Sequence, residues 1–159
     1  KEDNLKLAAL FIDLGKLGIP PEILRKTGKL SKAEYNIIKH HPEFAKEILR
    51  ATGNFGEIGD WILYHHERFD GKGSQMLEGE KIPLASRLIA VADTYSALVM
   101  DRSYKAAMDY DEAVSELRFV CGTQLDEELV NIFCEIPKNK VDACLFDAQN
   151  KMEVFKVPL

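Results

Sequence analysis

The sequence has little cysteine and no long apolar run. Its three cysteines, Cys121, Cys134 and Cys144, are an odd number, are widely spaced and form no Cys-x-x-Cys pair. This pattern excludes a disulfide framework and a cysteine-based zinc knuckle, so we expect reduced thiols and a cytoplasmic protein. No apolar run reaches the roughly 18 residues that a membrane-spanning helix requires, and no signal peptide is evident.

Positive charge is also in short supply. The 159 residues contain 21 Lys and Arg against 26 Asp and Glu, a net charge of -5. DNA or RNA is therefore not an expected partner, because backbone binding needs a broad basic face. A local cationic pocket for a small phosphorylated ligand is compatible with this balance.

What the sequence does have is helical periodicity. Ser31 with Glu34, and Asp109 with Glu112, have the spacing of residues that cap a helix start. After Pro137 the pattern changes, and residues 141–146 and 152–157 predict two strands joined by a turn at 147–151. We therefore predict an all-α helical bundle over residues 1–137 and a short C-terminal β-hairpin over 138–159. The amphipathic pattern is already under way at Lys1, so we expect a truncated N-terminal helix.

All four histidines occur in two adjacent pairs, His40-His41 and His65-His66. Pro42 forces the helix to kink or restart at His41, which leaves that ring free to point inward. We assign no role to His40. Other polar residues stand beside apolar helical stripes, and several helices of a bundle can present such residues to one internal point. The candidate cluster is Asp13, Lys16, His41, His65, His66 and Asp93. Three imidazoles with a carboxylate predict a first-row transition metal site.

Five blocks, taken in order, resemble the HD-GYP family, a branch of the HD superfamily of metal-dependent phosphohydrolases whose members hydrolyse cyclic di-GMP. The blocks are Ile12-Asp13-Leu14-Gly15-Lys16-Leu17-Gly18-Ile19-Pro20, His41-Pro42-Glu43, His65-His66-Glu67-Arg68-Phe69-Asp70-Gly71, Ile82-Pro83-Leu84-Ala85-Ser86-Arg87 with Ala92-Asp93, and Arg102-Ser103-Tyr104-Lys105. The resemblance extends from about Leu7 to Phe133. It implies the fold of an HD domain.

The resemblance also implies roles for individual residues. In the family the Asp of the His-Asp pair bridges two metals, and this role falls on Asp13. One metal takes three further histidines, which match His41, His65 and His66. The other takes a late Asp, matched by Asp93, and the His of the pair, where this chain has Ile12. We therefore expect one ion, or at most two, and a five- or six-coordinate site favours iron or manganese over zinc.

Substrate binding is implied in the same way. Lys16 matches a lysine beside the metals, and Arg102 and Lys105 match a basic pair that grips the substrate phosphate. The family's Gly-Tyr-Pro reads Gly73-Ser74-Gln75, so its nucleotide-contacting tyrosine has no counterpart. Glu67 and Arg68 either support the ligands or form a local salt bridge.

Two functions follow from this resemblance. The first is a phosphohydrolase of reduced activity on cyclic di-GMP or a related phosphodiester, with Asp13 and Lys16 as catalytic residues. The second is a degenerate signalling module that binds metal, nucleotide or a protein partner without turnover. The retained histidines favour the first function, whereas Ile12 and Ser74-Gln75 favour the second.

Overall fold

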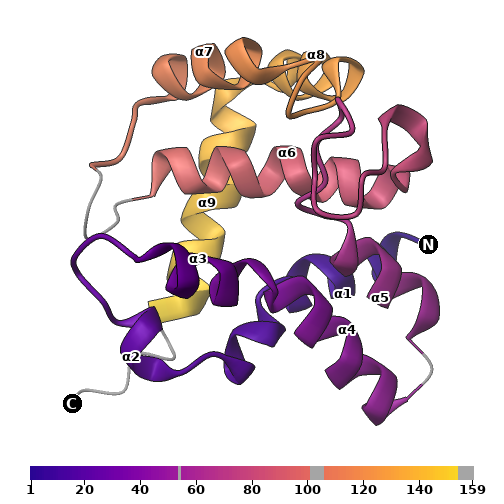
Figure 1. Ribbon diagram of the computed structural model, residues 1–159. Coiled ribbons are helices and arrows are strands. Elements are labelled where there is room, and N and C mark those ends of the chain that lie inside the picture. The colour runs from indigo at the N-terminus through magenta and orange to yellow at the C-terminus, as the bar shows by residue number, and fades with distance from the viewer. Residues whose placement is uncertain (54, 101–105, 154–159) are drawn as a thin grey trace.

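The computed structural model describes residues 1–53, 55–100 and 106–153, and in these ranges the chain is helical (Figure 1). No strand occurs among them, apart from two isolated β-bridges. The helices are α1 (Glu2–Phe11), α2 (Pro21–Leu24), α3 (Lys32–Lys39), α4 (His41–Thr52), α5 (Gly56–Leu63), α6 (Leu84–Val99), α7 (Tyr110–Val120), α8 (Glu127–Glu135) and α9 (Lys138–Glu153), with 3-10 turns η1 (Leu14–Gly18) and η2 (Gly79–Lys81). The all-α prediction is confirmed.

Local sequence signals account for the helix starts. The capping box of Ser31 and Glu34 opens α3, and that of Asp109 and Glu112 opens α7. Pro42 lies in the first turn of α4, where its missing N–H costs nothing. The helix therefore restarts at His41, as predicted.

The long helix α6 separates two apolar cores. In Figure 1 it runs through the middle of the molecule, with α7 and α8 on one side and α1, α4 and α5 on the other. Val91 and Tyr95 of α6 pack with Leu117 of α7 in the first core. Ile89 of the same helix packs with Ile62 of α5 in the second core. Helix α6 therefore contributes residues to both cores.

The predicted β-hairpin is wrong, because residues 138–153 form helix α9. The apolar residues Val141 and Leu145 are four apart, so a helix brings both to one face, and both contact the first core. The short apolar run 141–146 fits either period, and tertiary packing selected the helical one. Residues 154–159, the rest of the predicted second strand, lie outside the described residues. The expected domain boundary after residue 137 stays a prediction.

In the described part of the chain, no helix has both the length and the apolar character needed to cross a lipid bilayer.

Candidate metal centre

Three of the four histidines converge on one point. His41 is the first residue of α4, and His65 and His66 follow the end of α5. Each offers a ring nitrogen, and these three nitrogens lie within 4.8 Å of one another. The rings contact each other, with centroids 3.8 Å apart for His65 and His66 and 5.1 Å apart for His41 and His66. His40 is exposed, does not belong to this cluster, and has its Nδ1 3.6 Å from Glu43 Oε1.

The backbone orients two of the rings. His41 Nδ1 lies 2.9 Å from the carbonyl oxygen of Ile38, and His65 Nδ1 lies 2.6 Å from that of Ile62. A carbonyl only accepts, so each Nδ1 carries the proton and each Nε2 keeps its lone pair. His41 Nε2 is buried and has no hydrogen-bond partner within the described residues. A buried nitrogen without a partner is costly unless a ligand binds it.

Burial favours the neutral form of the His65 and His66 rings. Burial lowers the pKa of His65, and the nearby His41 lowers it further. The carboxylates of Asp93 and Asp13 raise it, but by less than burial lowers it. Loss of ring hydration holds the pKa of His66 well below its usual range, and the His65 and His41 rings add to the effect. Although His66 as a residue is exposed, its ring packs on both neighbours. Neutral imidazole is the form that binds a metal.

Asp13 lies at the edge of this cluster. Its Oδ1 is 3.7 Å from His41 Nε2 and 2.8 Å from Lys16 Nζ. The approach depends on Gly15, because a Cβ there would collide with the backbone of His41 and come within 2.6 Å of the Ala45 nitrogen. Because Gly15 has no Cβ, η1 can lie directly against the first turn of α4.

Among the described residues, the other predicted half of the site does not form a donor cluster. Asp93 is half-buried on α6 and lines a hollow of about 140 Å³ with His65 and His66. On its other side, a hollow of about 460 Å³ contains both Asp93 and Ile12. Ile12 packs against the second core and supplies no ligand atom. Arg102 and Lys105 lie outside the described residues.

Glu67 and Arg68 have different roles, which resolves the alternatives that the sequence left open. Buried Glu67 accepts hydrogen bonds from the backbone N–H groups of Gln75, at 2.9 Å, and Leu77, at 3.1 Å. It therefore shapes the loop that follows the histidines. Arg68 forms a local two-bond salt bridge with Asp70 and holds the pKa of that carboxyl at about 2. Gly73 is needed here, because a Cβ would lie 2.5 Å from Glu67 Oε1.

A pocket of about 400 Å³ opens beside the histidines. The residues that line it come from the histidine cluster, from α3 and from the loop after α5: His41, His66, Tyr35, Ile38, Lys39, Arg68, Lys72, Gly73 and Ser74. Sequence reasoning missed Tyr35, Lys39 and Lys72. The one available signal was the four-residue spacing of Tyr35 and Lys39 on the helix that leads to His41.

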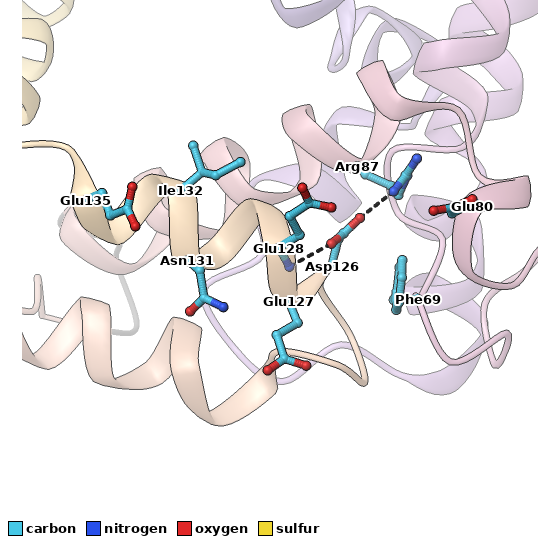
Figure 2. Close-up of a pocket in the computed structure, with 9 residues that line it drawn as sticks. All are labelled: Phe69, Glu80, Arg87, Asp126, Glu127, Glu128, Asn131, Ile132 and Glu135. Atoms are coloured by element: carbon cyan, nitrogen blue, oxygen red, sulfur yellow. Dashed lines mark hydrogen bonds and ion pairs between the residues drawn. The ribbon is translucent and has the colours of Figure 1, made fainter.

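A larger hollow of about 590 Å³ lies elsewhere, between α8 and the segment around η2 (Figure 2). Its walls are acidic, with Glu80, Glu127 and Glu128, and it contains no histidine. Figure 2 shows Arg87 of α6 paired with Asp126, which also caps α8. This ion pair joins two helices and contributes nothing to the metal cluster.

Comparison with known proteins places the chain in a family. A family model described as "HD domain" matches residues 1–129. The cyclic di-GMP phosphodiesterase response regulator RpfG of Xanthomonas campestris is 42% identical over 130 residues, covering 80% of this chain and 34% of that protein. A cyclic di-GMP phosphodiesterase of Thermotoga maritima is 36% identical over 142 residues, covering 87% and 39%.

A third relative, the 3'3'-cGAMP-specific phosphodiesterase 1 of Vibrio cholerae, is 37% identical over 131 residues, covering 80% of this chain and 30% of that protein. The chain thus spans about a third of the length of these relatives. The HD domain family is metal-dependent, in agreement with the cluster of three histidines. The chain belongs to the HD domain family and, by its motifs and its relatives, to the HD-GYP branch.

Proposed function

We propose that this chain is a metal-dependent phosphohydrolase domain that hydrolyses cyclic di-GMP or a related phosphodiester with reduced activity. The observation that carries the proposal is the buried Nε2 of His41, which has no hydrogen-bond partner in the described residues and belongs to a cluster of three ring nitrogens. The names of the relatives, which include phosphodiesterases of cyclic di-GMP and of 3'3'-cGAMP, support the substrate class.

In this proposal His41, His65, His66 and Asp13 hold one divalent ion. Three nitrogens and one carboxylate oxygen suit a first-row transition metal, with iron or manganese favoured because open positions remain only above four-coordination. Such an ion supplies Lewis acidity toward a phosphoryl oxygen and lowers the pKa of bound water. Asp93 is the carboxylate proposed for a second ion, and the aliphatic side chain of Ile12, which lines the same hollow, supports a single ion.

The chain's own groups then position the reaction. The carbonyl oxygens of Ile38 and Ile62 keep the His41 and His65 rings aimed at the shared point. Asp13 supplies the negative charge next to His41, and the Lys16 ammonium on the same carboxylate places positive charge where a phosphate arrives. Arg102 and Lys105, by their place in the family motif, are proposed to bind the substrate phosphate.

The alternative is a degenerate signalling module that binds metal, nucleotide or a protein partner without turnover. Ile12 favours it, because its side chain packs against the second core at the position where the family has a metal-binding histidine. A cytoplasmic location is part of either proposal and is supported by the free cysteines.

The test is metal analysis of the purified protein together with an assay of cyclic di-GMP hydrolysis. We expect about one transition metal ion per chain, and loss of that ion in His66→Ala. The matched control is His40→Ala. This variant loses the exposed imidazole next to His41 and should keep the metal. A wild-type protein without metal contradicts the phosphohydrolase function and the metal-binding form of the alternative, and rapid turnover contradicts the degenerate alternative.

A further inference from the structure

The pocket beside His41 and His66 has the character of a site for a flat, anionic ligand. Its cations, Lys39, Arg68 and Lys72, come from α3 and from the loop after α5, and no acidic residue is among the described residues that line it. Arg68 is already committed to Asp70 through two hydrogen bonds. The free positive charge of the pocket therefore comes mainly from the two lysines.

The lysines are available for a ligand. Lys72 is largely exposed, and its one ion pair in the described chain is a long contact of 3.8 Å to Asp70. Lys39 is exposed at the end of α3, and we find no ion pair for it within the described ranges. Lysine ammonium groups of this kind suit phosphate oxygens, because they act as mobile point charges.

Tyr35 supplies a flat apolar surface in the same pocket. Its side chain is 58% exposed although it is aromatic, and it stacks on no other ring among the described residues. The lining also contains Gly73 and Ser74, which are small and carry no ring. Among the described residues that line the pocket, Tyr35 is the aromatic side chain besides the two imidazoles.

We propose that Tyr35 stacks on the base of a nucleotide whose phosphate is met by Lys39 and Lys72, so that this pocket selects nucleotides among phosphodiesters. The inference rests on the proposed function, which places the phosphate that is hydrolysed at the three histidines. It adds that α3, not the loop 73–75, provides the aromatic ring that recognises the base. Base–aromatic stacking is strong enough to decide which phosphodiesters bind.

The experiment measures the affinity of the full, metal-loaded chain for cyclic di-GMP, with the metal content of every variant determined in parallel. Tyr35→Ala should weaken binding about fivefold or more. Tyr35→Phe should restore binding, because stacking needs the ring and not the hydroxyl. Phe119→Ala removes a ring that is 84% exposed on α7, outside the pocket, and should bind as the wild type does. Metal content should be the same in all four proteins.

Unchanged affinity in Tyr35→Ala overturns the inference. So does equal weakening in Tyr35→Phe, which would assign the effect to the hydroxyl, or loss of metal in Tyr35→Ala, which would make the role structural. If the metal-loaded wild type binds no cyclic di-GMP, the nucleotide site is wrong while the metal site stands. A wild type that holds no metal instead contradicts the proposed function itself.

Discussion

His41 and His65 use the same local device, in which the ring Nδ1 donates to the carbonyl three residues earlier in the chain. The partner carbonyls belong to the ends of α3 and α5, where helical carbonyls lack intrahelical partners. Each helix end therefore gains a donor, and each ring gains a defined tautomer. A single residue contact thus serves both helix termination and the orientation of an imidazole in the cluster.

Gly15→Ala tests the closest backbone contact at the site. The added methyl group meets the backbone of His41 and Ala45, so we expect the free energy of unfolding to fall by about 1–3 kcal/mol and metal content to drop as Asp13 moves away. Urea denaturation and metal analysis measure the two effects. The control is Gly28→Ala, where a Cβ has open space and stability should be unchanged. Equal stability of the two variants would show that η1 does not lie against α4.

At the scale of elements, the loop after α5 is held by a side chain of its own, that of Glu67. The two oxygens of the Glu67 carboxylate accept from two different backbone N–H groups, those of Gln75 and Leu77. A loop without regular structure thereby obtains a buried anchor, in place of the hydrogen bonds that a strand or helix would provide. This anchor fixes one wall of the pocket beside His66.

Glu67→Gln should loosen that loop. The amide keeps one acceptor oxygen and turns an NH2 group toward the second N–H, at a local cost of about 1–3 kcal/mol. Hydrogen exchange at the Gln75 and Leu77 amides should accelerate accordingly. Glu78→Gln, an exposed change in the same loop, is the control and should leave both rates as they are. Slow exchange in both variants would rule out Glu67 as the anchor.

Asp126→Ala tests the attachment of α8 to α6. The change removes the partner of Arg87 and the N-cap of α8 together, and it leaves a nearly buried guanidinium uncompensated. We expect a loss of about 3–5 kcal/mol in the free energy of unfolding. The partly exposed pair of Lys46 and Asp60 gives the comparison, and Asp60→Ala should cost about 1 kcal/mol or less. Similar losses in the two variants would contradict a structural role for the buried pair.

At the scale of the whole molecule, we expect α6 to couple the two cores into one cooperative unit, because it contributes residues to both. Residues two apart on this helix, Ile89 and Val91, belong to different cores. The single tryptophan, Trp61, packs on the second core, so its fluorescence reports on that side alone. Damage to the first core should therefore appear at Trp61 if the two cores unfold together.

Leu117→Ala makes this prediction specific. The side chain is fully buried in the first core, and its truncation should cost about 2–5 kcal/mol. Unfolding followed by Trp61 fluorescence should shift by the same amount as unfolding followed by far-ultraviolet circular dichroism. Phe119→Ala on the same helix removes an exposed ring and should change stability by about 0.5 kcal/mol or less. A shift seen by circular dichroism alone would mean that the cores unfold separately.

The sequence by itself determined the features that depend on near neighbours in the chain. Capping residues such as Ser31 set helix starts, Pro42 forced the restart at His41, and adjacent histidines indicated the cluster of ring nitrogens, because these effects act within a few residues. Tertiary structure decided the rest. The apolar run 141–146 fits a strand or a helix, and only contact with the core of α6, α7 and α8 selects α9. Tyr35 joins His66 in one pocket for the same reason, since residues distant in sequence meet only when the helices pack.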